Sequence, residues 1–469
     1  MFMSQFGRIL LEEQIINDEQ LSIALERQKR EGGRLGQNLS ALGFVTEQDI
    51  RRVFNKIPHI PETVAESGLD RSFINDLILK HLLSMSEFRI QDVVERIKLP
   101  IPIIESGLED LRNDKLIEIK GASSYNKLAY VFKLTELGIK RGGELLQLCR
   151  YVGPAPVTLP EYCKMVRVQT VKSVIINDKT LRNSLSHLVI NERVLGSIGP
   201  AFSSGQAVFI YGPPGNGKSA IAEAVGKVFP DSIYIPYSII VGGQIINVFD
   251  PVNHIPIEEP KGQGDFDTRW ILIKRPVIMA GGELTLKMLD LDFNPISKYY
   301  EASLQMKANN GLFVVDDFGR QLVEPSRILN RWIVPLERRV DFMSLHTGMK
   351  FTIPFDMLII FATNIEPKQL VDEAFLRRIR YKVRIDRPTP KEYEQIFRMV
   401  CESHGIQFNQ EVFIYLIEQC YQRFGVELSA SHPRDLIDHI VVDSHYFNRP
   451  PELSRQNIDK ACSNYFVDL

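Results

Sequence analysis

One stretch of the sequence decides the fold: Gly212-Pro213-Pro214-Gly215-Asn216-Gly217-Lys218-Ser219. It matches the pattern GxxxxGK[ST], in which backbone N–H groups curl around phosphate oxygens. The short apolar run Ala207–Tyr211 precedes it and suits a buried parallel strand, and Ala220–Val228 follows with a helical pattern. Strand, glycine loop and helix in this order predict a phosphate-binding loop at the start of an α/β domain.

The loop residues have distinct expected roles in binding a nucleotide. Lys218 is expected to reach the β- and γ-phosphates, and the Ser219 hydroxyl to ligate Mg²⁺. The N-terminus of the following helix adds a partial positive charge that favours the phosphates. The predicted nucleotide-binding residues are therefore Gly212, Pro213, Pro214, Gly215, Asn216, Gly217, Lys218, Ser219 and Ala220.

A second apolar run ends in two acids. Leu312–Val315 consists of four apolar residues and leads directly into Asp316 and Asp317. After a phosphate-binding loop this pattern is typical of a Walker B strand, so Asp316 is predicted to hold Mg²⁺ through its water shell, beside Ser219. Asp317 stands where a base would orient the attacking water. The two motifs predict a site that binds ATP with Mg²⁺ and hydrolyses it.

These motifs, with three later ones, resemble the AAA+ ATPases over residues 160–469. The resemblance implies a parallel-sheet core followed by a helical lid. The apolar run Met357–Ala362 leads into Asn364, which matches the sensor-1 amide that contacts the γ-phosphate and the water. Arg434, in the segment His432–Leu436, matches the sensor-2 arginine at the start of a lid helix.

The segment Phe375–Ile379 looks like the arginine-finger segment of the same family, in which the finger enters a neighbouring subunit's site. Arg377 and Arg378 are both candidates for the finger. Such an arginine is typically worth ~10³–10⁵ in rate, because it neutralises charge that develops in the transition state. The resemblance therefore implies a homo-oligomer, and a hexameric ring is expected.

The second acid of the Walker B motif departs from the family pattern. It is Asp317 where the family has glutamate, and the missing methylene displaces the carboxylate by about 1.5 Å, one carbon–carbon bond. A misplacement on this scale costs ~10²-fold in rate. The departure predicts slow turnover or a nucleotide-gated switch.

Residues 230–310 are a second departure, a long β-rich stretch in which Gly242-Gly243 predicts a hairpin turn. Another hairpin is expected at residues 339–353, directly before the strand that leads to Asn364. This placement resembles the MoxR-like and enhancer-binding AAA+ ATPases, in which inserts face the pore or a partner. The alternative is a sheet extension that only packs.

The first 57 residues contain an internal repeat. Gln5-Phe6-Gly7 opens one unit, and Arg34-Leu35-Gly36 opens the next, 29 residues on. In each unit an apolar stripe leads to a polar helix N-cap, Asn17 or Thr46, and then to an amphipathic helix. Residues 1–57 are therefore predicted to form a small helical domain of two similar halves.

This repeat resembles the MshE-type N-terminal domain of type II secretion and type IV pilus ATPases, some of which bind cyclic di-GMP through paired RLGxx-type motifs. The second unit fits through Arg34-Leu35-Gly36 and Gly43, whereas the first has Gln5 for the arginine and Gln14 for the inner glycine. Arginine stacks on bases and pairs with phosphate, so the loss of one weakens the ligand assignment. Cyclic di-GMP binding and a purely protein-docking role are both left open.

Residues 58–66 are expected to be a linker, followed at 67–150 by three helices and a two-stranded wing that resemble a winged-helix domain. The polar turn of the wing is expected at Gly121–Asn126. The candidate recognition helix, residues 102–114, has a net charge of −3. Phosphate contacts dominate DNA affinity and need cations, so this unit favours a protein partner over nucleic acid.

The remaining boundaries complete the predicted architecture. Residues 151–386 are expected to form the α/β nucleotide-binding domain, and 387–469 a helical lid. Between 157 and 206 we expect strand fragments and two short helices, one at Lys179–Leu188 capped by Asp178. The fold class is therefore α/β, with a P-loop AAA+ parallel-sheet core and a C-terminal helical lid, preceded by a small helical domain and a winged-helix-like domain.

The composition indicates a globular protein of a reducing compartment. The chain has 469 residues and a formal net charge of −2, which gives no electrostatic footprint for nucleic acid. Its five cysteines are scattered without a CxxC pair, which favours reduced thiols. No apolar run reaches the ~18 residues that cross a bilayer, and the opening Met1–Phe6 lacks the basic region of a signal peptide. A cytoplasmic location without membrane insertion is expected.

The function expected from these features is an ATP-hydrolysing remodelling or assembly factor that acts on a protein partner. The resemblance of the front domain links that partner to a type IV pilus or secretion machine. Two alternatives stay open: a transcription regulator with an ATPase ring, and a nucleotide- or cyclic di-GMP-gated adaptor with little turnover.

Overall fold

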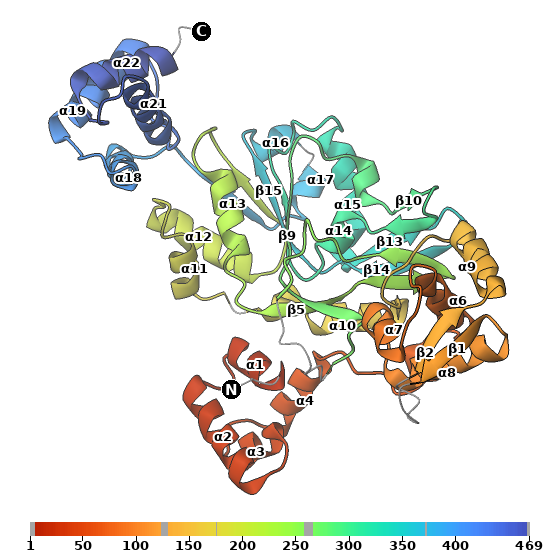
Figure 1. Cartoon of the computed structure of the whole chain (residues 1–469). Helices are drawn as coiled ribbons and strands as arrows, with labels where there is room; N and C mark the ends of the chain where they lie inside the picture. The colour runs from red at the N-terminus through yellow and green to blue at the C-terminus, as the bar shows by residue number, and fades with distance from the viewer. Residues whose placement is uncertain (1–4, 123–129, 175, 258–265, 371–372, 467–469) are drawn as a thin grey trace.

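The computed structural model describes residues 5–122, 130–174, 176–257, 266–370 and 373–466. A front unit (residues 5–57) and a middle unit (residues 67–150) precede a central sheet flanked by helices, and a helical lid follows it (Figure 1). Most of the turn expected at Gly121–Asn126, and most of the opening Met1–Phe6, lie outside the described residues. The predicted α/β class, with a parallel sheet at the centre, is confirmed.

The core is a five-stranded, all-parallel sheet. In spatial order its strands are β16 (Tyr381–Arg384), β4 (Val208–Tyr211), β15 (Leu358–Thr363), β12 (Leu312–Val315) and β9 (Val277–Ala280). Every residue of β12 and β15 is buried, as expected for parallel strands covered on both faces. Because β15 lies between β4 and β12, the carboxyl ends of these three strands are side by side.

Helices cover both faces of this sheet, and the strand side chains alternate between the two faces. One face is covered by α11 (Asp178–Ser184), α12 (Glu192–Ser203) and α13 (Lys218–Gly226). The other is covered by α15 (Pro325–Arg338), whose Trp332 is fully buried against the ring of Phe313. The glycine loop Gly212–Ser219 therefore leads from a buried strand into a helix that is itself packed on the sheet.

The stretch between 157 and 206 differs from the expectation. Its described residues contain three α-helices, α10 (Leu159–Val168), α11 and α12, where two short helices were predicted. The helix predicted at Lys179–Leu188 is capped by Asn177 rather than Asp178. The Asn177 side chain accepts a hydrogen bond from the Thr180 N–H at 2.8 Å, and its backbone is extended, whereas Asp178 is already helical. A cap requires the extended conformation, so the neighbouring residue takes this role.

The β-rich stretch at residues 230–310 builds a second layer. Its mixed sheet has the order β10 (Asp292–Asn294), β11 (Tyr299–Glu301), β7 (Gln244–Asn247), β6 (Ser238–Val241) and β3 (Val157–Thr158). Beside it, β5 (Ser232–Pro236) pairs antiparallel with β8 (Trp270–Lys274). The predicted turn at Gly242-Gly243 joins β6 to β7, and both glycines have positive φ. The stretch is not one insert, because β9 within it belongs to the core sheet.

The second predicted hairpin is also present. It consists of β13 (Val340–Ser344) and β14 (Lys350–Pro354), paired antiparallel directly before β15. Met343 and Phe351 pack into the buried cluster of the second layer. Phe342, on the opposite face of β13, has about half of its side chain exposed, and Met349, in the turn before β14, has nearly half exposed.

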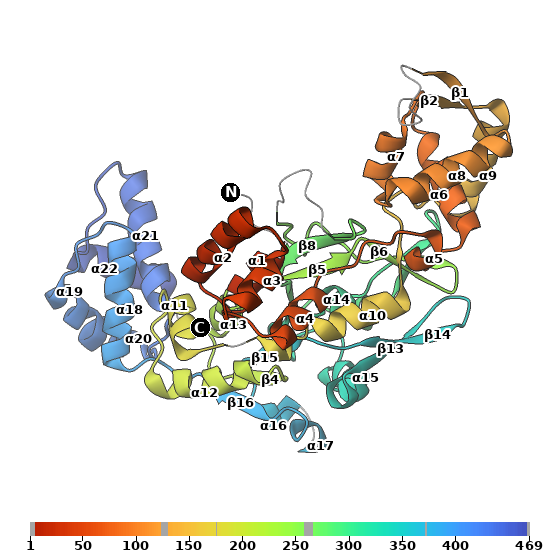
Figure 2. The same cartoon turned by 90° about the horizontal axis from the view of Figure 1, so that it is seen from below.

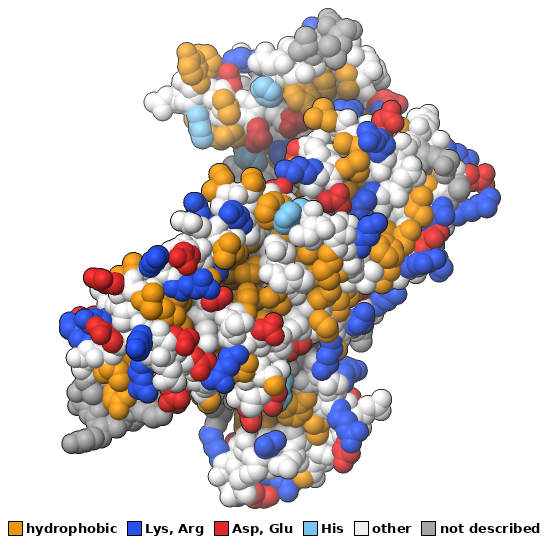
Figure 3. Space-filling model, turned by 90° about the vertical axis from the view of Figure 1, so that its right-hand side faces the viewer, with side chains coloured by type: hydrophobic (Ala, Val, Ile, Leu, Met, Phe, Trp, Pro, Cys, Tyr) orange, Lys and Arg blue, Asp and Glu red, His pale blue; other side chains and the backbone are white. Residues whose placement is uncertain are grey.

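The middle unit has the predicted order of three helices, a wing and a closing helix: α6 (Arg71–Leu82), α7 (Ile90–Ile97), α8 (Ile101–Asn113), β1 (Ile117–Ala122), β2 (Tyr130–Leu134) and α9 (Glu136–Leu148). Its buried cluster includes Ala155 and Ile245, so it is continuous with the second layer. Figure 3 views the molecule from the side of this unit, and Lys and Arg side chains are interspersed there with Asp and Glu. No single basic field dominates this face.

The segment expected to be a linker, residues 58–66, is held against the core. A one-turn helix, α5 (Val64–Ser67), begins inside it. The buried Arg269 guanidinium donates to the Ser67 carbonyl at 2.9 Å, and the Asp267 N–H donates to the Pro58 carbonyl at 3.0 Å. The proline-rich composition indicated an irregular connection, but the residues that fix it come from a distant part of the chain.

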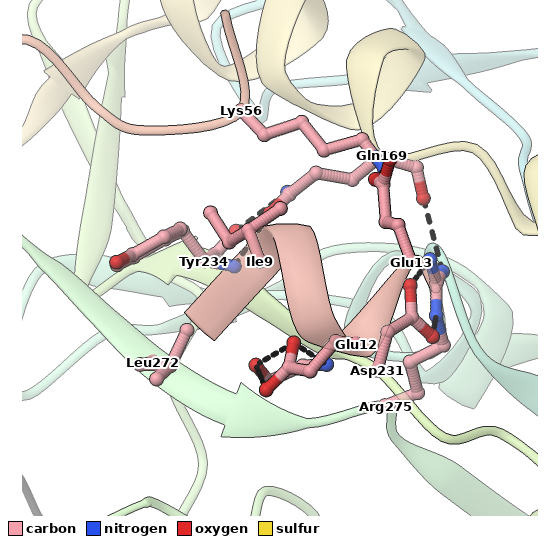
Figure 4. A pocket seen from close by; sticks show the side chains of 10 residues that line it. Ile9, Glu12, Glu13, Lys56, Gln169, Asp231, Tyr234, Leu272 and Arg275 are labelled. Carbon is pink, nitrogen blue, oxygen red and sulfur yellow. Dashed lines mark hydrogen bonds and ion pairs between the residues drawn. The ribbon is translucent and has the colours of Figure 1, made fainter. Parts of the chain in front are cut away.

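The front unit consists of four helices: α1 (Gln5–Glu12), α2 (Asp18–Glu31), α3 (Leu35–Ala41) and α4 (Glu47–Asn55). Asn17 and Thr46 cap α2 and α4 through reciprocal capping boxes, as predicted. The unit lies beside β5 and α10 of the core (Figure 2). There Glu12 accepts hydrogen bonds from the N–H and hydroxyl of Ser232, at 3.3 and 3.0 Å, in a small cleft (Figure 4).

The lid is a compact helical unit with its own buried cluster. Its helices are α18 (Pro390–Ser403), α19 (Gln410–Tyr415), which continues through a π-helical turn into α20 (Tyr421–Phe424), α21 (His432–Tyr446) and α22 (Arg455–Tyr465). In the described part of the chain, none of the helices combines the length and apolar character that a bilayer crossing requires.

Candidate active site

The carboxyl ends of three core strands bring the predicted site residues together. The loop Gly212–Ser219 follows β4, Asn364 follows β15, and Asp316 and Asp317 follow β12. The Ser219 hydroxyl donates to Asp316 Oδ1 at 2.9 Å, although the two residues lie 97 positions apart in the chain. Ligands of open parallel sheets bind outside the carboxyl ends of the strands, which makes this edge the candidate active site.

The backbone of the loop excludes side chains where it passes the neighbouring strand. A Cβ atom on Gly212 would lie 2.0 Å from the carbonyl oxygen of Ile385, and the φ of this glycine is 141°. Gly215 has φ 76°, which L side chains also rarely adopt. The first turn of α13 leaves its N–H groups without intrahelical acceptors. These groups suit the oxygens of a bound phosphate.

Lys218 is buried within the loop. Its Nζ donates to the carbonyl oxygens of Gly212 at 3.0 Å and Pro213 at 2.8 Å. Burial lowers the pKa of the Lys218 ammonium below its ordinary value, while the nearby carboxylates of Asp317 and Asp316 act in the opposite direction. A phosphate at the loop would therefore offset the cost of burying this cation.

Ser219 and Asp316 supply oxygen donors that suit Mg²⁺. The Asp316 carboxylate is fixed at the end of β12, because its Oδ1 accepts both the Ser219 hydroxyl and the Asp317 N–H, the latter at 3.0 Å. Mg²⁺ in nucleotide sites is usually held by one or two protein oxygens, water and the substrate phosphates. The donor set of these two residues fits such an ion.

Asp317 has an unusual backbone conformation. Its φ is 46°, in the left-handed region that few non-glycine residues adopt. The Asp317 side chain is exposed, and its Oδ1 accepts a hydrogen bond from Asn364 Nδ2 at 3.1 Å. Residues in sparsely populated backbone regions cluster at functional sites. A water beside this pair would meet one acceptor and one donor.

Lid residues that the sequence did not single out hold the loop from the other side. The Ser429 hydroxyl and the Ser431 N–H both donate to the Gly215 carbonyl, at 3.0 and 2.8 Å. The Ala430 N–H donates to Asn216 Oδ1 at 3.1 Å. The only sequence signal is a small-residue turn before a lid helix, and the contact itself depends on where the lid lies.

A small cavity of about 50 Å³ opens between the lid and the core beside Asn216. Ile190, Val194 and Ile385 form apolar walls, and Asp386 lies among its polar lining residues. Ligand sites commonly combine apolar walls with a few polar groups that fix orientation. Its place next to the loop suits the base of a nucleotide whose phosphates bind at α13.

The three predicted arginines lie apart from these groups. Arg377 follows α17 (Glu373–Leu376), is 77% exposed, and pairs with Glu373 at 3.5 Å. Arg378 is only 28% exposed and donates to Glu337 at 2.6 Å. Arg434 is exposed in the first turn of α21 and, within the described residues, makes no hydrogen bond or ion pair. Neither Arg377 nor Arg434 contacts the loop of its own chain through a hydrogen bond in this described part.

A larger cavity, of about 1060 Å³, lies between the front unit and the core. Its lining includes the first residues of both repeat units, Gln5 and Phe6 from the first and Arg34-Leu35-Gly36 from the second, with Lys164 and Trp270 on the core side. The structure thus brings the two motif segments to one cavity.

The inner positions of the two repeat units adopt the same backbone conformation. Gln14 and Gly43 occupy equivalent positions and both have positive φ, 55° and 73°. The first unit therefore keeps the left-handed turn although the glycine has been replaced. The departure noted in the sequence changes the residue and leaves the backbone of the repeat intact.

Comparison with family models matches residues 389–464 to a domain of unknown function (DUF8689), within the lid. No curated protein sequence matches the chain. Among solved structures, a mutant of Thermotoga maritima RuvB has a TM-score of 0.34 at 10% identity, covering 64% of this chain and 74% of that one. Domain III of the Thermotoga maritima replication initiation protein DnaA gives 0.36 at 12%, covering 61% and 98%. The FIGL-1 AAA domain in complex with ADP gives 0.31 at 13%, covering 64% and 81%. Because these TM-scores are low, the argument for the candidate site depends on its own geometry and not on these similarities.

Proposed function

We propose that this chain is an ATPase of the AAA+ type that binds ATP with Mg²⁺ and hydrolyses it. One observation carries the proposal: the Ser219 hydroxyl meets the Asp316 carboxylate at 2.9 Å, beside a glycine loop that opens a helix. This contact joins the two halves of a nucleotide site that lie on different strands. The strand order supports it, because β15 brings the Asn364 amide to the same edge.

Each group has a role in the proposed reaction. Lys218 and the first-turn N–H groups of α13 bind the β- and γ-phosphates, and the cavity between lid and loop takes the base. Mg²⁺, held by Ser219 and through water by Asp316, would neutralise charge on the phosphates. Asp317 and Asn364 orient the attacking water, and the exposed Asp317 carboxylate accepts its proton.

Nucleotide binding and phosphate release by the purified full-length protein test this proposal. The wild type is expected to do both, and Lys218→Ala to lose both, because the phosphates lose their cation. Lys227→Ala, at the exposed far end of the same helix, is the matched control and should keep both activities. Equal nucleotide affinity in the wild type and Lys218→Ala would reject the proposed site.

The arginine finger is proposed to come from a second copy of the chain. Arg377 is the better placed candidate, because its side chain is largely exposed, whereas Arg378 is held by Glu337. Arg434 is proposed to approach the γ-phosphate from the lid of the same chain. A homo-oligomeric ring, of six subunits in the AAA+ manner, would bring Arg377 of one copy to the site of the next.

Subunit mixing tests the finger. Arg377→Ala chains are expected to bind ATP but not hydrolyse it, since their sites receive no finger. Adding Lys218→Ala chains, which cannot bind ATP but still carry Arg377, should restore part of the activity in mixed rings. An Arg377→Ala protein that hydrolyses ATP at the wild-type rate would reject this assignment.

A protein is proposed as the partner on which the ATPase acts, with a pilus or secretion component suggested by the front-unit resemblance. The β13–β14 hairpin exposes Phe342 and Met349, which a protein surface would cover. The candidate recognition helix α8 is acidic, and the surface of that side carries both charge signs. These observations do not favour the transcription-regulator alternative, since DNA needs a basic surface.

Cyclic di-GMP binding by the front unit is a second candidate function, and the cavity of about 1060 Å³ favours it. Both motif segments line it, and Arg34 offers a guanidinium for a base or phosphate. Titration of the full-length protein with cyclic di-GMP should then give heat that Arg34→Ala abolishes. Arg30→Ala, at the exposed end of α2, should leave that heat unchanged. No heat at micromolar ligand rejects this function.

A further inference from the structure

One buried polar side chain, that of Gln321, holds the turn that carries Asp317. Its Nε2 donates to the carbonyl oxygens of Asp316 at 3.0 Å and Asp317 at 3.3 Å, and its Oε1 accepts from the Gly319 N–H at 2.8 Å. Nε2 also donates to the Gly281 carbonyl, after β9, at 3.2 Å. Carbonyl groups at one end of the amide and an N–H at the other fix its orientation.

The placement of Gln321 is unusual for a glutamine. Only 9% of it is exposed, although it lies in a loop, and glutamine is a mostly exposed residue type. Its amide fills the inner side of a turn in which the Arg320 N–H bonds the Asp317 carbonyl at 2.9 Å. A left-handed aspartate persists only when the surrounding structure holds it there. Gln321 supplies that restraint from inside the turn.

We propose that Gln321 is a positioning residue for ATP hydrolysis, whose amide holds Asp317 in the conformation that directs its carboxylate at the attacking water. The inference rests on the proposed ATPase function. The hydrogen bonds of Gln321 in the described structure all go to backbone groups of the turn and of the loop after β9. It therefore acts through the backbone of Asp317 and not on the nucleotide.

The geometry indicates which kinetic constant Gln321 controls. Nucleotide binding depends on the loop at residues 212–219 and on Asp316, and Asp316 has its own support, because its N–H donates to the Ala280 carbonyl at 2.9 Å. Orientation of the water depends on Asp317. Without the amide the turn relaxes and the carboxylate moves, and a displacement of about 1 Å costs ~10²-fold in rate.

The test compares Gln321→Met, which keeps the side-chain length but has no amide, with Gln369→Met, at an exposed position of α16 (Pro367–Leu370). The kcat and KM of the full-length proteins are measured, with the affinity for a non-hydrolysable ATP analogue. In Gln321→Met, kcat should fall about 10²-fold while KM and affinity stay within about twofold, and the control should match the wild type. An unchanged kcat overturns the inference and leaves the ATPase function standing. A wild type that neither binds nor hydrolyses ATP overturns both.

A double-mutant cycle separates positioning from general support of the fold. Asp317→Asn keeps the left-handed backbone, since asparagine tolerates it, but removes the carboxylate. If Gln321 acts through Asp317, the double variant hydrolyses ATP at the single-turnover rate of Asp317→Asn alone. If the rate losses of Gln321→Met and Asp317→Asn add in the double variant, the inference is overturned. A loss of nucleotide affinity in Gln321→Met as large as its loss of kcat overturns it as well. Should Gln321→Met fail to fold, Gln321→Glu, which keeps the acceptor for Gly319, is measured in the same cycle.

Discussion

Polar clusters lie at both ends of the core strands, at the edge formed by their amino ends (the amino edge) and at the edge formed by their carboxyl ends (the carboxyl edge). The two clusters are built in opposite ways. At the amino edge, Arg275 is almost fully buried and donates to Asp231 and to the carbonyls of Gln169 and Asn310, over 2.5 to 2.9 Å. At the carboxyl edge, the Asp317 carboxylate faces solvent from a left-handed backbone. The first cluster is closed by protein partners, and the second faces solvent.

Burial and charge alone therefore do not mark a functional site. Each edge contains a buried cation near acids, yet the partners at the amino edge are fixed protein groups. Asp356, for example, accepts hydrogen bonds from the Thr170 hydroxyl, the Val171 N–H and the Asn310 amide. Polar groups satisfied in this way specify a fold. The carboxyl edge differs because the carboxylate of Asp317, on its left-handed backbone, faces solvent beside the glycine loop.

The largest expected effect is on stability, at the amino edge. Arg275→Leu leaves Asp231 without its guanidinium, and removing one partner of a buried pair typically costs about 3–5 kcal/mol. Denaturant unfolding should show this loss. Arg275→Lys keeps the charge but not the planar fork, so an intermediate loss is expected. A loss below about 1 kcal/mol in Arg275→Leu would show that this edge is not structural.

At the carboxyl edge the expected effect is on activity. Lys218→Met should reduce hydrolysis by about 10²–10³-fold, the usual result of removing one positioned electrostatic group. Its unfolding free energy should stay unchanged or rise, because a buried ammonium is costly without a strong partner. Phosphate release and denaturant unfolding measure the two effects. If Lys218→Met destabilised the protein as much as Arg275→Leu, the two edges would not differ in their contribution to stability.

A smaller stability gain is expected at Asp317. Glycine adopts φ 46° without the steric cost that an L residue has, so Asp317→Gly should raise the unfolding free energy by about 0.5–1 kcal/mol while abolishing turnover. Asp317→Asn should lose turnover without that gain. A destabilised Asp317→Gly protein would mean that the conformation is not strained.

The smallest effect concerns the contact of the front unit with the amino edge. Burial raises the pKa of Glu12 above its ordinary value, partly offset by Arg8 and by the hydrogen bonds from Ser232, and Asp231 adds to the rise. The docked carboxyl therefore binds its proton more tightly than the undocked one. Docking should be strongest below the ordinary pKa and weaken as pH rises through the raised pKa, by no more than about 1.4 kcal/mol per pH unit.

Fluorescent labels on the front unit and the core would report this docking as a function of pH. Glu12→Gln should remove the pH dependence. Glu13→Gln is the matched control, because Glu13 pairs with Lys56 and Arg52 inside the front unit and should leave the dependence in place. A pH profile that Glu12→Gln does not alter would show that another group governs the contact.

The contiguous motifs of the candidate site were predictable from the sequence. A glycine loop between an apolar strand and a helix, and two acids at the end of another apolar run, specify the local geometry of the two segments that carry Ser219 and Asp316, whose side-chain oxygens lie 2.9 Å apart. The turn at Gly242-Gly243 followed from the same kind of local signal. In each case the residues that set the conformation are neighbours in the chain.

The supporting contacts were not predictable, because they join segments that are distant in sequence. Ser429 and Ser431 meet Gly215 only because the lid lies over the loop. Gln321 is an isolated glutamine in a loop, and nothing in its neighbourhood signals a buried amide. The contacts that hold the linker segment were not predictable for the same reason, since Arg269, which holds Ser67, follows some two hundred residues later.

The place of β4 between β16 and β15 also has a consequence for synthesis on the ribosome. Both of its sheet neighbours, β15 and β16, are encoded after residue 357. At ~5–20 residues per second, β4 emerges on the order of ten seconds before either neighbour. Its two hydrogen-bonding edges are unpaired throughout that interval, so chaperone capture or slow codons between residues 211 and 358 would act on the strand that leads into the glycine loop Gly212–Ser219.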